Sequence, residues 1–321
     1  MAKVYIPEAV AESGTRFLLE RGYEILSGTD LSEEGMCREI AGCDAMLIRN
    51  LPCPAALLEA GSNLKIVARH GVGYDNVDTA AAQNLGIWVT NTPMALSDSV
   101  AEYTLAAILL AAKNIESCSR ALYEGNYFYK NRHKGMDLSG KTLGIFGFGR
   151  IGRALARRAH FGLDMRILAY SRTLKQEDVP EYVTVCSRET LLSQSDVVSL
   201  HIPGGKANRG LFDSDTFEKM KSGAILVNVA RGEVVDEAAL IRALDSGKLS
   251  FAVLDVQNRE PPEMDDPLRR HEKILLTPHM ASNTEECMER MSLHAAWQIH
   301  KVLSGERPDW PVNLPVTVKN V

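Results

Sequence analysis

Three glycines, Gly147, Gly149 and Gly152, constrain the fold of this chain more than any other feature of its sequence. They follow the apolar run KTLGIF and open the segment RIGRALARRAH, which has the composition of a helix. Between a strand and a helix, this spacing allows a tight turn, close approach of a pyrophosphate to the backbone, and close packing of helix on strand. The unpaired N–H groups of the helix then face the negative charge. The spacing therefore predicts a dinucleotide-binding turn, and a glycine-rich turn without a ligand is the alternative.

Short β-rich runs alternate with helical patterns on both sides of this turn. Such alternation with short connections is typical of parallel sheets that helices cover on both faces. In the first part of the chain we expect strands at 3–6, 23–26, 45–49, 65–68 and 87–90. In the second part we expect strands at 142–146, 166–170, 182–185, 196–201, 224–229, 251–256 and 274–276. The predicted fold class is α/β, with two doubly wound parallel sheets.

Because 321 residues exceed one typical domain, we expect two domains. Two long helices are expected to link them. Ser99 and Glu102 have the spacing of a capping box, and the run that follows predicts a helix as far as Ile115. This run is apolar around its circumference, so another domain or subunit is expected to cover it. A last helix at 285–303 would return the chain to the first sheet. The expected domains are 1–97 plus 284–321, and 98–283.

Charge balance and cysteine usage argue against several classes of protein. The chain has 36 Lys and Arg against 41 Asp and Glu, so it has no basic surplus for nucleic acid or an anionic membrane. No apolar run approaches the ~20 residues of a membrane span. Its six cysteines form no C-x-x-C pair, which favours reduced thiols and no metal site. From the reduced thiols, and a start without a leader-like pattern, we expect a cytoplasmic protein; from the charge balance, we expect no nucleic-acid or membrane partner.

Arg231, Glu260 and His279 each follow a predicted strand of the second sheet. Ligands of open parallel sheets bind beyond the carboxyl ends of the strands, so we expect these side chains to share one edge. Histidine is suited to proton transfer near neutrality, and a carboxylate beside it would orient the ring. A guanidinium can hold a carboxylate by two parallel hydrogen bonds. Each residue alone could be an ordinary surface charge, but together they predict oxidation of an alcohol that bears a carboxylate.

The end of the strand at 166–170 bears on the choice of cofactor. An NAD-binding unit usually carries an acidic residue here, which accepts hydrogen bonds from the ribose hydroxyls. This chain has Ser171 and Arg172 instead. These side chains can receive the 2′-phosphate of NADP by hydrogen bond and ion pair, whereas a carboxylate would repel it. The expected cofactor is NAD(P), with NADP favoured over NAD; alternatively, Arg172 stacks over the adenine or lies in solvent.

Several segments, in this order, resemble the D-isomer-specific 2-hydroxyacid dehydrogenase family. The matching segments are ARHGVGYDNVD (68–78), NTP and SVAE (91–102), GKTLGIFGFGRIG (140–152), LHIP (200–203), NVARGEVVD (228–236), LDVQNREPP (254–262), TPHMAS (277–282) and PVN (311–313). The resemblance covers nearly the whole chain. It implies a Rossmann cofactor domain, 98–283, inserted in a flavodoxin-like substrate domain, and dimer contact through the helix near 98–115.

The resemblance also implies roles for individual residues. Arg231 would bind the substrate carboxylate, His279 would act as acid and base, and Glu260 would pair with His279. The residues expected to bind the cofactor are Gly147, Gly149, Arg150, Ile151, Gly152, Ser171, Arg172, His201, Pro203, Val229, Ala230, Arg231, Asp255 and His279. The residues expected to bind the substrate are Arg49, Arg69, Val72 and Gly73.

The activity implied is hydride transfer between a nicotinamide and a small 2-hydroxy or 2-oxo acid of the hydroxypyruvate, glyoxylate or 3-phosphoglycerate type, by a homodimer. The alternative is a dinucleotide-sensing binding protein, like the corepressor branch of the family. Formate-oxidising relatives have Gln where this chain has Glu260, which argues against that activity. Gly204, Gly205 and Lys206 depart from the threonine–proline stretch that the family usually has after LHIP.

Overall fold

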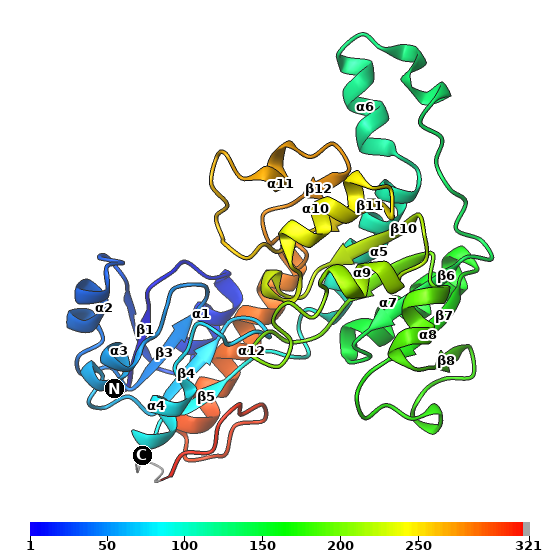
Figure 1. The fold of residues 1–321 in the computed structure, drawn as a ribbon. Coiled ribbons are helices and arrows are strands. Elements are labelled where there is room, and N and C mark those ends of the chain that lie inside the picture. Colours follow the sequence, from blue (N-terminus) through cyan, green and yellow to red (C-terminus); the bar gives the residue numbers. More distant parts are fainter. Residues whose placement is uncertain (317–321) are drawn as a thin grey trace. The chain divides into compact units, whose positions relative to one another are not determined.

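The computed structural model describes residues 1–316, and the chain divides into two compact units (Figure 1). One unit comprises Met1–Leu96 and Asn283–Val321, and the other comprises Ser97–Ser282. Each of the two domain boundaries expected from the sequence lies one residue later in the chain than the corresponding boundary in the structure. Residues 317–321, which the sequence assigns to the first domain, lie outside the described residues. Each unit contains one parallel sheet, as predicted.

The first unit is built on a five-stranded sheet with the order β2-β1-β3-β4-β5. Its strands are β1 (Lys3–Ile6), β2 (Glu24–Ser27), β3 (Ala45–Ile48), β4 (Ile66–Arg69) and β5 (Trp88–Thr90). Its helices are α1 (Glu12–Leu19), α2 (Glu33–Glu39), α3 (Ala55–Ala60), α4 (Thr79–Asn84) and α12 (Glu285–Leu303). Successive residues of a strand point to opposite faces. Leu47 accordingly packs with Ile299 of α12, and Met46 packs with Leu57 of α3.

The second unit is built on a seven-stranded sheet with the order β12-β11-β10-β9-β6-β7-β8. Its strands are β6 (Thr142–Phe146), β7 (Arg166–Tyr170), β8 (Val183–Val185), β9 (Val197–Leu200), β10 (Ala224–Asn228), β11 (Leu249–Leu254) and β12 (Ile274–Leu276). Counted within the unit, the order is 3-2-1-4-5-6 followed by a seventh strand. This is the Rossmann order, and it places a crevice where the strand order reverses, between β6 and β9.

Helices cover both faces of this second sheet. They are α5 (Ser97–Ala112), α6 (Ile115–Tyr123), α7 (Arg150–Leu163), α8 (Arg188–Gln194), α9 (Ser214–Lys219), α10 (Glu237–Asp245) and α11 (Pro267–Arg270), with short 3-10 helices η1 (Tyr127–Asn131), η2 (Gln176–Asp178) and η3 (Gly232–Val234). Ile108 of α5 and Ala156 of α7 pack on one face with Ile145. Leu191 of α8 and Leu240 of α10 pack on the other face.

The predicted helix from the capping box to Ile115 is wrong at both ends. The helix begins at Ser97, so Ser99 lies inside its first turn and is buried rather than capping it. It ends at Ala112, and Asn114 adopts a left-handed backbone with φ of 51° before α6 begins. The apolar circumference of α5 is largely covered by α7, β10 and β11 of its own unit.

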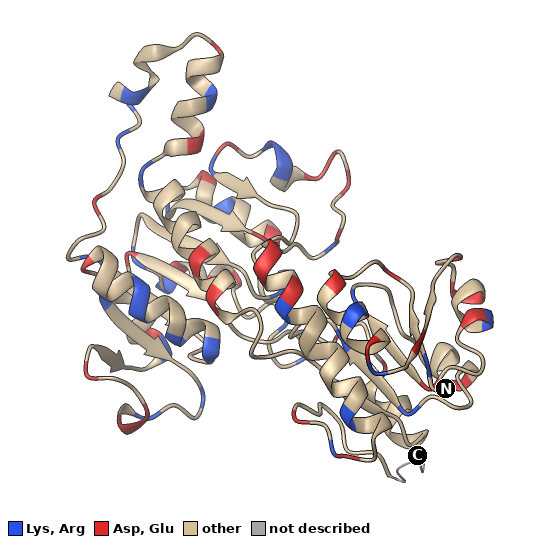
Figure 2. Cartoon of the chain, turned by 180° about the vertical axis from the view of Figure 1, so that it is seen from behind, with Lys and Arg blue, Asp and Glu red and all other residues tan. Residues whose placement is uncertain are grey.

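Charged residues of both signs are interspersed on the helices of both units (Figure 2). Within residues 1–316, no helix combines the length and the apolar character needed to cross a bilayer. The same part of the chain contains no group of three His, Cys, Asp or Glu side chains arranged to hold a metal ion.

Candidate active site

The carboxyl ends of six adjacent strands in the second unit bring most of the predicted site residues to one edge of the sheet. The glycine turn follows β6, Ser171 and Arg172 follow β7, and His201 follows β9. Arg231 follows β10, Asp255 follows β11, and His279 lies three residues beyond β12. Because all these strands are parallel, their carboxyl ends lie on the same side of the sheet.

The glycine turn fits a dinucleotide pyrophosphate. Gly147 has φ of 100°, and a Cβ atom there would lie 2.5 Å from the carbonyl oxygen of His201. A Cβ atom on Gly152 would lie 2.6 Å from the carbonyl oxygen of Gly147. A Cβ atom on Gly149 would meet no atom within 4 Å, so the space above it is open. Gly149 is also the N-cap of α7 and contributes no side-chain cap, which leaves first-turn N–H groups for an anion.

The loops that flank the glycine turn carry other predicted cofactor ligands. Ser171 is half-buried, whereas Arg172 is exposed. The Leu174 N–H donates to the Ser171 carbonyl and closes a turn between them. The His201 backbone N–H donates to Phe146, which ties β9 to β6 beside the turn. Its Nε2 atom lies 2.9 Å from the Ser199 hydroxyl, and burial lowers the pKa of His201 to about 3. Neutral His201 therefore adds no positive charge to this edge at physiological pH.

His279 and Glu260 form a hydrogen-bonded pair. The Nδ1 atom of His279 lies 2.8 Å from Oε2 of Glu260. A carboxylate only accepts hydrogen bonds, so Nδ1 carries the proton and Nε2 is the ring atom left to exchange a proton with a ligand. The two side chains are 49% and 36% exposed, so a small molecule can reach them.

The pKa of Glu260 is held below its ordinary value by opposing effects. Burial acts to raise the pKa, but the hydrogen bond and charge of His279 lower it. The backbone N–H of Gln257 and the charge of Arg231 lower it further. Because the positive charge of Arg231 acts on Glu260, all three predicted catalytic residues belong to one electrostatic cluster.

Asp255 fixes the turn that carries His279. Its carboxylate, which is fully buried, accepts from the Thr277 hydroxyl at 2.7 Å and from the N–H groups of Met280 and Ala281 at 2.8 Å each. The His279 N–H donates to the carbonyl oxygen of Asp255. The turn needs this support because His279 has φ of 49°, a left-handed conformation that non-glycine residues rarely adopt. Burial raises the pKa of Asp255 although these hydrogen bonds and the charge of His279 oppose the rise.

Arg231 lies in a turn that is anchored from both sides. Asn228, fully buried at the end of β10, donates from its side chain to the Arg231 carbonyl and accepts from the Ala230 N–H. A Cβ atom on Gly232 would lie 2.0 Å from the carbonyl carbon of Gln257, so glycine is required there for close approach. This contact holds the loop that bears Arg231 against the loop that bears Glu260. The Arg231 Nη1 donates to the Ala230 carbonyl at 2.7 Å.

The four predicted substrate ligands lie in the first unit, after β3 and at or after the end of β4. Arg49 donates from its side chain to the carbonyl of Ala9. Arg69 folds back over Gly71 and donates to the His70 carbonyl at 2.6 Å. The Val72 carbonyl accepts from Asn91, while the N–H groups of Val72 and Gly73 have no acceptor within residues 1–316. These two donors fit the predicted role of receiving a carboxylate.

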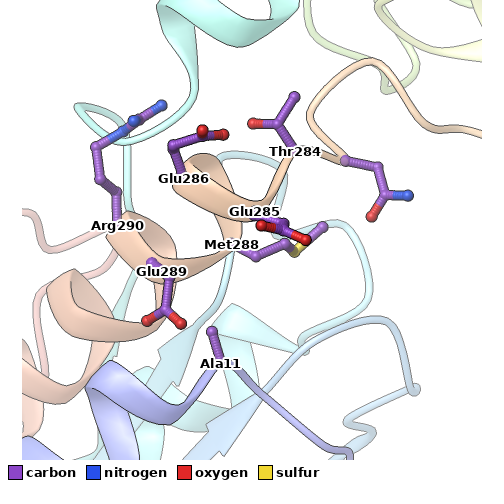
Figure 3. Close-up of a pocket in the computed structure, with 8 residues that line it drawn as sticks. Ala11, Thr284, Glu285, Glu286, Met288, Glu289 and Arg290 are labelled. Carbon is purple, nitrogen blue, oxygen red and sulfur yellow. The ribbon is translucent and has the colours of Figure 1, made fainter.

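A hollow of about 790 Å³ opens beside the first turns of α12 in the first unit (Figure 3). The carboxylates of Glu285, Glu286 and Glu289 project from the helix around it, and Glu289 points toward Ala11. Glu289 is bound to the backbone N–H of Ser13. This acidic lining would repel an anionic substrate, so the hollow is a poor candidate for the site.

Several supporting residues have little or no signal in the sequence. The Tyr103 hydroxyl of α5 lies 2.5 Å from the Thr277 hydroxyl, which in turn donates to Asp255. Tyr103 and Thr277 are 174 residues apart, and Tyr103 lies within an apolar helix where core packing is the simplest interpretation. Tyr103 therefore has no signal in the sequence, whereas Thr277 has a positional one, as the first residue after β12.

Residues 105–281 match the family described as D-isomer specific 2-hydroxyacid dehydrogenase, NAD binding domain. The chain is 38% identical to D-3-phosphoglycerate dehydrogenase of Archaeoglobus fulgidus over 98% of this chain and 59% of that protein. It is 36% identical to hydroxypyruvate reductase of Thermotoga maritima over 94% of this chain and 98% of that protein. The solved NADPH-dependent glyoxylate/hydroxypyruvate reductase of Sinorhizobium meliloti has a TM-score of 0.87 and 26% identity, over 99% of this chain and 100% of that chain.

The matched phosphoglycerate dehydrogenases are longer proteins, of which this chain spans 51 to 60%. The hydroxypyruvate reductase is matched over almost its whole length. The resemblance drawn from the sequence is thus confirmed by identity that extends over both units. The chain belongs to the D-isomer specific 2-hydroxyacid dehydrogenase family.

Proposed function

We propose that this chain is an NAD(P)-dependent dehydrogenase that interconverts a small 2-hydroxy acid and its 2-oxo acid. The observation that carries the proposal is the hydrogen bond between His279 and Glu260 at the edge of the sheet that bears the glycine turn. A histidine oriented by a carboxylate, next to a place for a dinucleotide, is the arrangement that oxidation of an alcohol requires.

The chemistry divides among three side chains. When bound, the nicotinamide accepts the hydride from the alcohol carbon, or returns it to the carbonyl carbon. Nε2 of His279 takes the hydroxyl proton during oxidation and gives it back during reduction. Glu260 keeps Nδ1 protonated and favours the imidazolium that forms. Arg231 holds the substrate carboxylate and polarises the carbonyl oxygen.

The cofactor would lie over the glycine turn, with its pyrophosphate on the N–H groups of Arg150, Ile151 and Gly152 at the start of α7. Ser171 and Arg172 would receive the 2′-phosphate of NADP. Arg172 is exposed, which supports this choice because its side chain can reach a phosphate from solvent. His201, Pro203, Val229 and Ala230 would line the rest of the cofactor site, and Asp255, which is fully buried, would support it through the turn that carries His279. The Sinorhizobium meliloti relative is NADPH-dependent by its name.

The substrate would be an anion of the hydroxypyruvate, glyoxylate or 3-phosphoglycerate type. The names of the relatives support these three acids. Arg49, Arg69 and the N–H groups of Val72 and Gly73 would contribute further anion contacts. Glu260 also supports a hydroxy acid over formate, because formate oxidation has no hydroxyl proton for a Glu-paired histidine to remove.

A substrate panel tests this proposal. Purified protein is incubated with NADPH or NADH and with glyoxylate, hydroxypyruvate or phosphohydroxypyruvate, and nicotinamide absorbance is followed. We expect turnover with at least one acid and higher kcat/KM with NADPH. Binding of the dinucleotide without turnover of any acid would favour the corepressor-like alternative instead. A preference for NADH would overturn the assignment of Ser171 and Arg172.

We further propose that the protein is a homodimer. In Figure 1, α6 and the segment that follows it extend away from the sheet of their unit. Apolar side chains are exposed along this arm, namely Ile115, Leu122, Tyr123, Tyr127 and Phe128. Several large apolar side chains exposed on one projecting segment are typical of a subunit interface. We propose that residues 115–128 take part in this interface together with the predicted contact near 98–115, and sedimentation of the protein with charged substitutions at Tyr123 and Phe128 tests it.

A further inference from the structure

The loop that follows β9 departs from the family pattern at Gly204, Gly205 and Lys206, and the structure shows what it contacts. Oε1 of Glu233 accepts from the backbone N–H of Gly205 at 2.5 Å. Oε2 of the same carboxylate accepts from Nη2 of Arg209 at 2.7 Å. Glu233 lies in η3, two residues beyond Arg231. One side chain therefore joins the loop after β9 to the turn that bears Arg231.

Gly204 provides the space that this carboxylate occupies. A Cβ atom on Gly204 would lie 2.4 Å from Oε1 of Glu233 and 3.2 Å from Cγ of Arg231. Gly204 does not have the positive φ that would demand glycine for backbone reasons, whereas Gly205 does, with φ of 97°. The space at Gly204 is therefore filled by side chains alone, the carboxylate of Glu233 and the stem of Arg231, and a methyl group there would displace the carboxylate.

The loop is also fixed at its two ends. The Asn208 side chain, which is buried, donates to the carbonyl of Pro203 at 2.8 Å. The backbone N–H of Gly210 donates to the carbonyl of Glu233 at 2.8 Å. Between these fixed ends, Gly205 and Arg209 are held through the Glu233 carboxylate. The Asn208 and Arg209 N–H groups also donate to the Gly205 carbonyl, so loss of the Glu233 carboxylate would leave this turn formed but would release it from η3.

We propose that Glu233 and Gly204 act together as a positioning pair that sets the stem of Arg231 and the loop at 203–209. Glu233 is a positioning residue that acts through Arg231. The inference rests on the proposed function, in which Arg231 holds the substrate carboxylate. The simpler interpretation is that Glu233 and Arg209 form a surface ion pair, because Arg209 is 72% exposed and such pairs contribute little.

The two interpretations predict different results for Gly204→Ala, Glu233→Ala and Glu233→Gln. The added methyl of Gly204→Ala meets the mobile end of Glu233, so the carboxylate leaves Gly205 while the fold is retained. We expect the KM for the oxo acid to rise about 5- to 20-fold, with a much smaller change in cofactor Kd. Glu233→Ala should raise this KM by a similar factor. Glu233→Gln keeps an acceptor for the Gly205 N–H and should stay within about 3-fold of the native protein.

The double variant Gly204→Ala/Glu233→Ala gives the decisive comparison. Because the colliding carboxylate is gone, its KM should be close to that of Glu233→Ala alone rather than the product of the two effects. Gly162→Ala is the matched control, since its methyl group meets no atom within 4 Å, and it should leave KM unchanged. Thermal unfolding of each variant reports that it is folded.

Multiplicative effects of the two substitutions, or equal effects of Glu233→Ala and Glu233→Gln, would overturn the inference. Arg231→Lys separates this failure from failure of the proposed function. If Arg231→Lys raises KM but the Gly204 and Glu233 variants do not, only the positioning pair is wrong. If Arg231→Lys also leaves KM unchanged, the role of Arg231 is wrong, and the inference falls with it.

Discussion

His279 Nδ1 lies 2.8 Å from Glu260 Oε2, although the two residues follow different strands of the sheet. Glu260 receives a second hydrogen bond from the backbone N–H of Gln257, which fixes its carboxylate independently of His279. The loop after β11 therefore fixes the position of Glu260, and the turn after β12 places His279 against it. A ring held in this way keeps one nitrogen for its partner and one for the substrate.

Glu260→Gln should reduce both turnover and pH-dependent stability. The pKa of Glu260 is lowered in the folded protein, so its ionisation contributes stability above its unfolded pKa of about 4.3, and this contribution is lost as the pH falls through the folded value. The difference in melting temperature between the native protein and the variant should thus shrink as the pH falls from neutral to below the unfolded pKa of about 4.3. Thermal unfolding across this range measures it. A difference that stays constant with pH would contradict the assignment.

Asp255→Asn should destabilise the protein and misplace His279. A neutral amide keeps one acceptor oxygen and turns the other position into a donor, which faces the N–H of Met280 or Ala281. An unsatisfied buried donor costs about 1–3 kcal/mol. We expect a lower denaturant midpoint together with lower kcat. Thr277→Ser keeps the hydroxyl that donates to Asp255 and serves as the control. Its denaturant midpoint should stay near the native value. A decrease in midpoint as large as that of Asp255→Asn would argue that packing, not the hydroxyl, matters.

Gly149→Val and Gly152→Ala separate cofactor binding from folding. A Cβ atom at Gly149 would meet no protein atom within 4 Å, so we expect the fold to tolerate valine while the dinucleotide is excluded. At Gly152 the added methyl meets the backbone oxygen of Gly147 at 2.6 Å, so stability should fall by about 1–3 kcal/mol. Dinucleotide titration and thermal unfolding measure the two effects. Native cofactor affinity in Gly149→Val would exclude a pyrophosphate over this turn.

Arg231→Lys should raise the KM for the oxo acid and leave cofactor affinity near its native value. Lysine keeps the charge but lacks the planar pair of donors that matches a carboxylate. Loss of one charge-assisted hydrogen bond corresponds to about 1.5–3 kcal/mol, or a KM increase of about 10- to 100-fold. Steady-state kinetics with saturating cofactor measure it. A variant with lower kcat but native KM would place Arg231 in transition-state stabilisation alone.

Much of the fold could be predicted because the buried strands are uninterrupted apolar runs bounded by turn residues. β6, β7 and β12 have the predicted bounds for this reason. β11 differs from its predicted range: it begins at Leu249, where a register shift against β10 and the exposed Ser250 hide the pattern. The strand ends at Leu254; the backbone N–H of Asp255 still donates to Asn228 of β10, while its side chain binds the turn at 277–281.

From the sequence, the site residues could be predicted only where a polar residue closely follows a predicted strand. Arg231, Glu260 and His279 have this signal, since each polar residue closely follows an apolar run. Tyr103 and Glu233 do not: one resembles core, the other a surface charge, and only tertiary contacts give them roles. The arm at residues 115–131 has no clear sequence signal either, because its helix α6 is short and its apolar side chains face outward.

The central claim is that His279 exchanges the substrate proton, and the kcat of His279→Ala with the best acid of the panel tests it most directly. General acid–base catalysis contributes about 10²- to 10⁴-fold, so kcat should fall by that factor while dinucleotide affinity and melting temperature stay near native values. Turnover that is undiminished in His279→Ala would contradict the account.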